Sequence, residues 1–340
     1  MKEKILLSGY TKRLSKGIYS VTLDTETEEL SDLAELISVS GPTYLALDKK
    51  NHLYSVAAGK EANGGLSSFS FNGQDISFLN SVFEEGAPHC HLSVDEEKNL
   101  VYAANYHKGE VHTYHRLTDG SLELSDFVKH EDHHGPKPEQ NAPHCHYAGL
   151  TPDQKLVVCD LGNDELYIYD VSDEGKLSQS FVYKSAEGAG PRHIVFSSDG
   201  HTAFLACELD STVEVLSYEN GQFSLLQKIS TLPAEHQTFN GVAAIRLSSD
   251  NNFLYVSNRG HNSITIYKVE GQSLELLSII KTEGEIPRDF NLIGDENFLL
   301  VAHQESDNLT LFKRDKLTGQ LKIKQKDFFC PEATCVVPLI

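Results

Sequence analysis

One recurring phrase constrains the fold of this chain more than any other sequence feature. A small residue, usually followed by proline, precedes a polar residue, an alternating apolar run and an aspartate, as in residues 41–48 and 87–95. The anchor of each copy falls at positions 42, 88, 143, 191, 242, 287 and 331, in steps of 46, 55, 48, 51, 45 and 44 residues. Steps of this length are typical of a repeated supersecondary unit. We therefore interpret the chain as seven copies of one unit.

Each unit contains further short runs of alternating apolar and polar residues. In the fifth unit they cover residues 253–258, 263–268 and 274–280. Alternation with a period of two between turn residues predicts half-buried strands, and no long helical periodicity is present. Four strands in each of seven units predict an all-β fold, a seven-bladed β-propeller with four-stranded antiparallel blades.

The two ends of the chain complement each other. Residues 5–8, 17–23 and 30–39 resemble the second, third and fourth strands of a blade that lacks its first strand. Residues 331–339 supply a first strand with nothing after it. Pairing of the N- and C-terminal strands would close the ring and leave no open sheet edge. We expect residues 1–340 to form a single propeller domain.

This strand order places two kinds of segment on one face. The loop that enters the first strand and the turn that leaves the second strand lie at the same end of each blade, around the mouth of the central channel, where propellers usually carry their sites. The entry loops carry His89, His91, His144, His146, Arg192, His193, Arg288 and Asp289, and the ends of the second strands carry Asn105, Asp160, Glu208, Arg259, His303 and Gln304. The chain has only seven arginines, three of them at these positions. Because guanidinium groups match carboxylate and phosphate oxygens, the pattern predicts a small anionic ligand.

Composition excludes several other functions. The chain has 29 basic and 49 acidic residues and a net charge of −20, which argues against nucleic-acid binding. It has no apolar run long enough to span a membrane and no secretory signal, so we expect a cytoplasmic protein without a membrane partner. The six cysteines are scattered without a CxxC pair and are expected to be reduced thiols. The sequence does not indicate the oligomeric state.

Five phrases identify a family. They are 141–146 (Asn-Ala-Pro-His-Cys-His), 190–196 (Gly-Pro-Arg-His-Ile-Val-Phe), 207–213 (Cys-Glu-Leu-Asp-Ser-Thr-Val), 255–261 (Tyr-Val-Ser-Asn-Arg-Gly-His) and 286–290 (Ile-Pro-Arg-Asp-Phe). In this order and spacing they resemble the seven-bladed lactonase family. That family includes propeller-type 6-phosphogluconolactonases and carboxy-cis,cis-muconate lactonizing enzymes. The resemblance extends over essentially the whole chain.

The resemblance implies a set of site residues. The proposed catalytic residues of the family match His144, Arg192, Glu208 and Arg259, with His146 as the neighbouring candidate. We add substrate-binding candidates at equivalent mouth positions, which are His146, His193, Arg288, Gln304 and His89. Two positions differ from the family pattern. Glu139-Gln140-Asn141 stands where phosphogluconolactonase-like members often carry Arg-Gln, and Ala244 stands where an acidic residue is common. The structural alternative is that Arg192 and Arg259 form ion pairs between blades, with Glu208 or Asp160 as partners.

The implied activity is hydrolysis of a phosphorylated sugar lactone, 6-phospho-D-glucono-1,5-lactone, in the pentose phosphate pathway of carbohydrate metabolism. Glu208 or His144 would activate water and the arginines would bind the oxyanion and the phosphate, with no cofactor and no metal. The alternatives are a muconate-type lactonizing enzyme (a cycloisomerase) and a ligand- or protein-binding propeller without enzymatic activity. The histidine-rich run at residues 130–138 is interpreted as a solvated insertion, with metal binding as its alternative.

Overall fold

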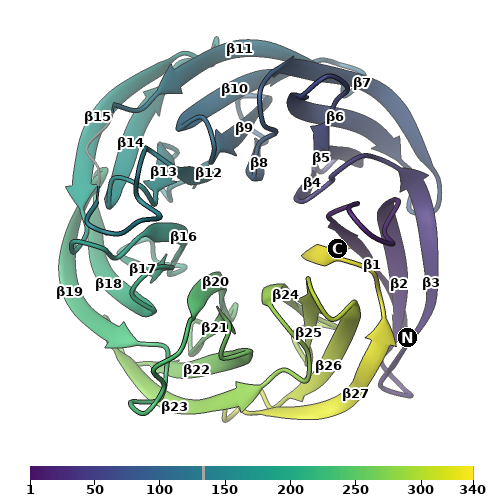
Figure 1. Ribbon diagram of the computed structural model, residues 1–340, viewed down its shortest axis with the longest axis vertical. Coiled ribbons are helices and arrows are strands. Elements are labelled where there is room, and N and C mark those ends of the chain that lie inside the picture. Colours follow the sequence, from purple (N-terminus) through teal and green to yellow (C-terminus); the bar gives the residue numbers. More distant parts are fainter. Residues whose placement is uncertain (132–134, 340) are drawn as a thin grey trace. The chain divides into compact units, whose positions relative to one another are not determined.

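The structure, a computed structural model, describes residues 1–131 and 135–339. Every regular element in this part of the chain is a β-strand, and the strands form seven four-stranded sheets (Figure 1). The chain divides into two compact units. One comprises Met1–Ser38, Val195–Ser217 and Leu225–Ile340, and the other comprises Val39–Ile194 and Tyr218–Ser224.

Three sheets belong to the first unit. In spatial order they are β28 (Ala333–Pro338), β1 (Lys2–Gly9), β2 (Gly17–Asp24) and β3 (Glu29–Ser38); then β20 (Gly241–Leu247), β21 (Phe253–Arg259), β22 (Ser263–Val269) and β23 (Leu274–Lys281); and then β24 (Pro287–Ile293), β25 (Phe298–His303), β26 (Asn308–Arg314) and β27 (Leu321–Phe329).

Three more sheets belong to the second unit. They are β4 (Leu45–Leu47), β5 (His52–Ala58), β6 (Asn63–Phe71) and β7 (Ile76–Glu85); then β8 (His91–Asp95), β9 (Leu100–Asn105), β10 (Glu110–Arg116) and β11 (Leu122–Lys129); and then β12 (Cys145–Leu150), β13 (Leu156–Asp160), β14 (Glu165–Val171) and β15 (Leu177–Lys184). The seventh sheet contains residues of both units. Its strands are β16 (Pro191–Phe196), β17 (Thr202–Cys207), β18 (Thr212–Glu219) and β19 (Gln222–Ser230).

These sheets confirm the predicted fold class, a seven-bladed β-propeller with four antiparallel strands in each blade. The terminal strands pair as expected. Leu7 lies opposite Val336 in the antiparallel ladder between β1 and β28, so the C-terminal strand completes the N-terminal blade (Figure 1). The interpretation of residues 1–340 as one domain stays a prediction.

Burial follows strand position within each blade. All residues of β9, β13, β17 and β25 are buried, which explains why the second strands are nearly continuous apolar runs. The fourth strands consist largely of exposed and partly exposed residues, as in β27, where Leu321 alone is buried. Aspartates that end the anchor phrases hold turns. Asp95, for example, accepts hydrogen bonds from the backbone N–H groups of Glu97 and Lys98, each at 2.9 Å.

Two further expectations can be compared with the structure. All six cysteines are free thiols, in agreement with the prediction from their spacing. Within the described ranges, no helix is long and apolar enough to cross a membrane.

Candidate active site

The entry loop of β12 is fastened to the turn that follows β13. One carboxylate oxygen of Asp160 accepts hydrogen bonds from the backbone N–H groups of His144 (2.8 Å), Gly162 (3.0 Å) and Asn163 (3.1 Å). The N–H of Leu161 donates to the carbonyl of His144 at 3.0 Å. The loop that enters the first strand and the turn that leaves the second strand therefore meet, as the strand order predicted. Asp160 holds this junction together.

The His144 ring is held on both nitrogens. Nδ1 lies 2.8 Å from the carbonyl oxygen of Tyr106, which can only accept, so Nδ1 carries a proton. Nε2 lies 3.1 Å from the side-chain amide of Asn141, which can donate or accept a hydrogen bond depending on which way the amide is turned. The ring also stacks on Tyr106, with centroids 4.2 Å apart. To accept a proton from water, Nε2 would have to exchange its Asn141 contact for that water molecule.

Three buried histidines from successive blades bring their rings together in the second unit. His193 lies 5.3 Å from His146 and 5.3 Å from His91, measured between ring centroids. The three side chains are 3–5% exposed. Tyr44 and Tyr147 flank His91, each with its ring centroid at 4.4 Å. The group (His91, His146, His193, Tyr44 and Tyr147) combines three buried imidazoles with two partly exposed phenol groups.

His91 and the tyrosines were not among the predicted site residues. The sequence did contain a signal for His91, because it occupies in its Pro-His-x-His phrase the position that His146 occupies in the next copy. The backbone N–H of Ala148 donates to His91 Nδ1 at 3.3 Å. Nδ1 is therefore the acceptor, and a neutral His91 carries its proton on Nε2.

Arg192 is the second residue of β16, directly before His193, and is 3% exposed. A guanidinium group at this depth requires polar or charged partners. Its positive charge also acts on the Cys159 thiol. Burial and the Asp160 carboxylate raise the pKa of Cys159 well above its usual range, and Arg192 opposes this only in part. Cys159 is thus a neutral thiol and no candidate nucleophile.

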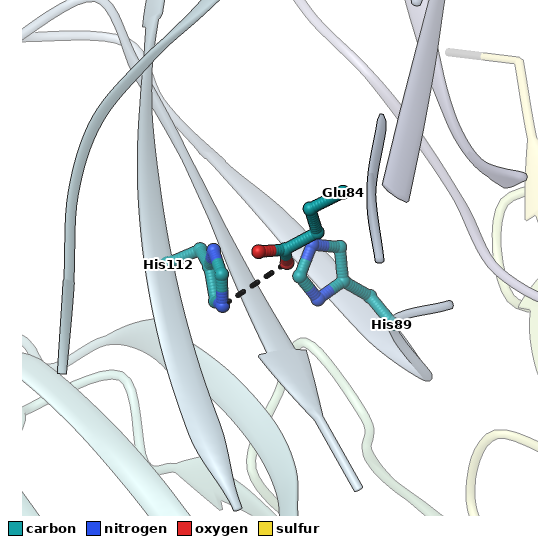
Figure 2. A group of neighbouring side chains, drawn as sticks. All are labelled: Glu84, His89 and His112. Atoms are coloured by element: carbon teal, nitrogen blue, oxygen red, sulfur yellow. Dashed lines mark ion pairs between the residues drawn. The ribbon is translucent and has the colours of Figure 1, made fainter. Parts of the chain in front are cut away.

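His89 belongs to a different group of side chains. Its Nε2 lies 2.7 Å from the Tyr114 hydroxyl, and its ring centroid lies 4.7 Å from that of His112. Glu84 completes this group (Figure 2). Burial lowers the pKa of His89 well below its usual range, with the positive charges of His112 and Lys108 acting in the same direction. His89 is therefore neutral, and its contacts differ from those of the other histidine candidates.

In the first unit, Glu208 and Arg259 form an ion pair. Arg259 Nη2 lies 2.8 Å from Glu208 Oε1, and the guanidinium also donates to the carbonyls of Gly241 (3.3 Å) and Val242 (3.1 Å). A Cβ atom on Gly241 would lie 2.9 Å from Arg259 Nη2, so a glycine leaves the space that this side chain fills. The N–H of Val242 donates to the Glu208 carbonyl at 3.2 Å. Glu208 and Arg259 thus meet at the entry to β20.

Arg288 and Gln304 also meet in the first unit. Arg288 Nη1 donates to Gln304 Oε1 at 3.1 Å, and the guanidinium lies 5.6 Å from the centroid of the Tyr10 ring. These two candidates come from the start of β24 and the residue after β25. The prediction that entry loops and second-strand ends share one edge holds within this blade too.

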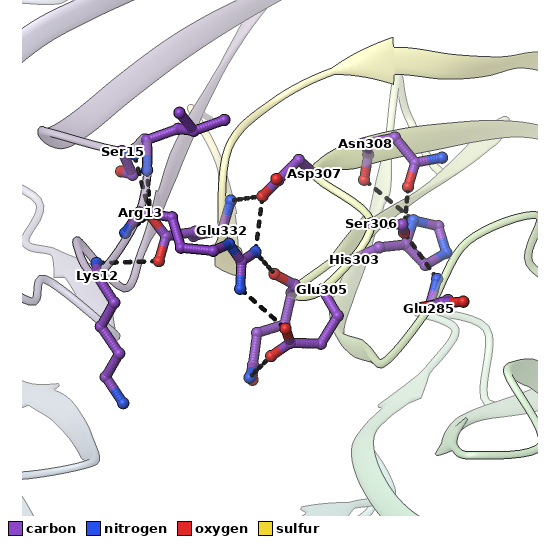
Figure 3. Close-up of polar contacts among 12 residues, drawn as sticks. Lys12, Arg13, Ser15, Glu285, His303, Glu305, Ser306, Asp307, Asn308 and Glu332 are labelled. Carbon is purple, nitrogen blue, oxygen red and sulfur yellow. Dashed lines mark hydrogen bonds and ion pairs between the residues drawn. The ribbon is translucent and has the colours of Figure 1, made fainter.

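A polar network next to Gln304 joins the two ends of the chain (Figure 3). The carboxylate of Glu332, which lies just before β28, accepts hydrogen bonds from four consecutive N–H groups at 2.9–3.0 Å. Those donors are Lys12, Arg13, Leu14 and Ser15. Arg13 forms ion pairs with Glu305 (2.8 Å) and Asp307 (2.9 Å). The network fixes the segment between β1 and β2 against the C-terminal blade strand.

The predicted site residues therefore form groups within each unit. The second unit holds His144, the histidine group and Arg192, and the first unit holds two polar pairs, Glu208–Arg259 and Arg288–Gln304. Convergence of the two sets on one cavity stays a prediction.

A cavity of about 560 Å³ lies in the second unit, next to the entry loop of His144. It is lined by His107, Lys108, Glu110, Lys129, His130, Glu131, Ala142 and Pro143. A volume of this size accommodates a small organic ligand. Apart from the loop residues, none of these side chains is part of a phrase that identified the family.

His130 is the described histidine of the predicted insertion, and its nitrogens are both engaged. Nδ1 lies 2.6 Å from Asp160 Oδ2, and Nε2 lies 2.9 Å from the Tyr169 hydroxyl. The alternative of a metal at residues 130–138 also involved Asp132, His133 and His134, which lie outside the described residues.

Comparisons with known proteins agree with the motifs. Residues 4–338 match the family model described as lactonase, 7-bladed beta-propeller. The chain is 57% identical to an uncharacterized protein of Lactococcus lactis subsp. cremoris (strain MG1363) over 100% of both chains. It is 39% identical to the 6-phosphogluconolactonase of Bacillus subtilis (strain 168), covering 96% of this chain and 95% of that protein. A crystal structure of a protein from Lactobacillus plantarum superposes with a TM-score of 0.98 at 46% identity, over 100% of both chains.

Proposed function

Because this chain belongs to the seven-bladed β-propeller lactonase family, we propose that it hydrolyses 6-phospho-D-glucono-1,5-lactone to 6-phosphogluconate. The observation that carries the choice of substrate is the similarity to the Bacillus subtilis protein named 6-phosphogluconolactonase, which extends over nearly the whole chain. In this proposal the protein acts on a small anionic substrate in the cytoplasm. Arg192 and Arg259 are the arginines proposed to bind the anion, since a guanidinium group matches carboxylate and phosphate oxygens.

Lactone hydrolysis sets three chemical tasks. Water must lose a proton as it attacks the carbonyl carbon, the resulting oxyanion must be stabilised, and the ring oxygen must gain a proton when its bond to that carbon breaks. In our proposal Arg192 and Arg259 stabilise the oxyanion and hold the phosphate, together with Arg288 and Gln304. Histidine or carboxylate side chains transfer the protons.

Glu208 and His144 are the two candidates for the base. Glu208 is held by Arg259, which fixes the direction of its carboxylate but also occupies Oε1, one of the two oxygens that could accept a proton. His144 would have to release Asn141 to bind a water molecule at Nε2. His146 and His193 lie together and are proposed to contact the substrate, since buried imidazoles can both donate and accept hydrogen bonds.

The test is the rate of lactone hydrolysis, followed by acid release and corrected for the spontaneous reaction. Arg192→Ala and Arg259→Ala should each lower kcat/KM about a hundredfold, as expected for loss of one oxyanion contact. Lys268→Ala serves as the control, because Lys268 is 49% exposed and forms its ion pair with Glu270, just after β22. If neither variant slows hydrolysis, the assignment is wrong. A muconate-type diacid is assayed in parallel, and turnover of the diacid alone would identify a lactonizing enzyme instead.

A further inference from the structure

A compact group of side chains that could ligate a metal consists of Glu84, His89 and His112. It is separate from the proposed active-site residues of the other blades. Glu84 lies on β7, His89 lies between β7 and β8, and His112 lies on β10, so two blades contribute. Each residue offers one ligand atom, and these three atoms lie within 4.8 Å of one another. Figure 2 shows the carboxylate of Glu84 turned toward the two rings. Its Oε1 lies 3.4 Å from His112 Nε2.

Several donor atoms in this group have no hydrogen-bond partner. Among the described residues, no hydrogen-bond partner is found for the buried nitrogens His89 Nδ1 and His112 Nδ1, and Glu84 Oε1 has only its ion-pair contact with His112 Nε2. The two histidines are only 2% and 0% exposed. Buried polar atoms are normally satisfied, and two unpartnered ring nitrogens beside a carboxylate indicate a missing ligand.

The other nitrogen of each histidine is held by the protein. His89 Nε2 contacts the Tyr114 hydroxyl at 2.7 Å, and His112 Nε2 contacts Glu110 Oε2 at 3.0 Å. Metal-binding histidines are commonly oriented in this way by a carboxylate or hydroxyl on the second ring nitrogen. Burial also favours the neutral imidazole, which is the form that binds metals.

We propose that Glu84, His89 and His112 bind a divalent transition-metal ion and that Zn²⁺ fits the donor set best. Two imidazoles and one carboxylate form a common protein ligand set for zinc, with a fourth position left for water. Zinc binds nitrogen and oxygen ligands at about 2.0–2.2 Å. Side-chain rotations that move each ligand atom by about 1 Å would bring the three atoms to this distance from one ion. In this proposal His89 is a metal ligand rather than a substrate contact, and the lactonase activity proposed above uses no metal.

Lys108 forms ion pairs with the carboxylates at this group. Its Nζ lies 3.1 Å from Glu84 Oε2 and 2.9 Å from Glu110 Oε2. The ammonium group binds Oε2 of Glu84, so Oε1 stays on the side of His112. A metal ion and Lys108 therefore compete for the same carboxylates. Lys108→Gln should remove this repulsion and tighten metal binding about tenfold.

A second group, His130, Cys145 and Asp160, has ligand atoms equally close together but lacks available donors. His130 uses both nitrogens, and Asp160 Oδ1 accepts the three backbone hydrogen bonds at the entry loop of β12. Burial raises the pKa of Cys145 well above its usual range, and the Asp160 charge adds to this effect, so the thiol keeps its proton. This group serves as an internal comparison for the experiment.

The experiment titrates the full-length, metal-free protein with ZnCl₂ by isothermal calorimetry, without substrate. One Zn²⁺ per chain should bind, and the unfolding temperature should rise by about 3 °C with zinc in excess. Glu84→Gln should weaken binding about a hundredfold. Glu85→Gln is the matched control, because Glu85 is the next residue of β7 and is exposed. His112→Gln tests a second ligand in the same way. If this variant of a buried residue does not fold, Glu84→Gln still decides the result, because Glu84 is only partly buried.

Cobalt identifies the ligands. Co²⁺ bound to this group should give visible absorption without a thiolate charge-transfer band, because the set contains no cysteine. Cys145→Ser should bind zinc as tightly as the unmodified chain. The proposal is overturned if Glu84→Gln binds zinc normally, if Cys145→Ser loses the metal, or if no zinc binds at all.

Discussion

A single ion pair holds the acidic residue of the proposed active site. Glu208 is 19% exposed and Arg259 is 11% exposed, so water still reaches the pair. Glu208→Gln should therefore change the free energy of unfolding by only about 1 kcal/mol, since Arg259 keeps its bonds to the carbonyls of Gly241 and Val242. If Glu208 is the base, kcat should fall by a hundredfold or more, with about 10²–10⁴ expected for general base catalysis.

Steady-state kinetics of Glu208→Gln distinguish the two roles of this residue. Loss confined to kcat supports a base, whereas a raised KM with an unchanged kcat supports a residue that only orients Arg259. Glu270→Gln is the control, because Glu270 forms an ion pair with Lys268 at 2.6 Å and is 52% exposed. An unchanged kcat/KM for Glu208→Gln would remove this residue from the catalytic set.

Sequence reasoning identified which candidate residues meet within a blade but not all of their partners. Arg288 meets Gln304 because the first and second strands of one blade end at the same edge. Glu208 was predicted to be a catalytic carboxylate, with an ion pair to Arg192 or Arg259 as the alternative, and the structure shows the pair with Arg259. Period-two patterns indicate which face a side chain occupies and leave its rotamer and its partner in the next blade undetermined. The same limit explains why the contacts of His89 with His112 and Tyr114 were not foreseen.

At the scale of elements, the junction between the β12 entry loop and the turn after β13 positions His144. Gly162 lies at its closest point, where an added Cβ would come within 1.8 Å of the Ala142 carbonyl oxygen and 2.9 Å of the His144 nitrogen. Gly162→Ala should push the loop away, cost about 2–3 kcal/mol in unfolding free energy and lower activity with it. Chemical denaturation and the lactone assay measure the two effects.

Gly271→Ala provides a contrast for this prediction. Gly271 has a φ of +60° and no neighbouring atom within 4 Å of an added Cβ, so alanine there costs only backbone strain of about 1 kcal/mol. The lactonase activity of the Gly271→Ala protein should be unchanged. Equal activity in the Gly162→Ala and Gly271→Ala proteins would show that the junction does not position a reacting group.

Glu332 joins the elements at the two ends of the chain. Burial alone would raise the pKa of Glu332, but hydrogen bonds from Ser15, Arg13, Lys12 and Leu14 outweigh it and hold the pKa below its usual range. A carboxylate with a lowered pKa stabilises the folded state above its unfolded-state pKa, and this stabilisation is lost as pH falls through the folded-state value. Glu332→Gln should cost about 2 kcal/mol at pH 7.

The pH dependence of unfolding tests the Glu332 prediction. The difference in stability between the unmodified chain and Glu332→Gln should shrink as the pH falls below about 4.5, where the carboxylate protonates in the unfolded chain. Glu305→Gln, at the exposed side of the same network, should cost less than 1 kcal/mol. A Glu332→Gln protein as stable as the unmodified chain would mean that the N-terminal segment is held by other contacts.

For the whole molecule, the repeat predicted the fold well because seven copies of a weak strand signal reinforce one another. The number of blades, the four strands in each and the pairing of β28 with β1 all followed from the spacing of the anchors. The metal-ligating group was not predicted, because Glu84, His89 and His112 come from two blades and no local motif joins them. Repeats predict the backbone, whereas such groups depend on side chains that differ from one copy to the next.

Stability of the molecule at acid pH should depend on His303. This residue ends β25, is fully buried, and donates from Nδ1 to the Asn308 carbonyl at 3.0 Å. Burial lowers its pKa from 6.5 to about 4, against the opposing effects of that hydrogen bond and of Asp327, the nearby charged group. The unfolded chain therefore binds a proton at a higher pH than the folded one, and stability decreases as the pH falls from 6.5 towards 4.

The expected loss from His303 is about 2 kcal/mol between pH 6.5 and 5, a window in which most carboxylates stay ionised. His303→Gln keeps a donor for the Asn308 carbonyl and does not titrate, so its unfolding free energy should fall less across this window. Urea denaturation at several pH values measures both slopes. Because burial opposes protonation only while the β25 terminus stays packed, equal slopes would show that His303 becomes protonated without unfolding, through local opening at that strand end.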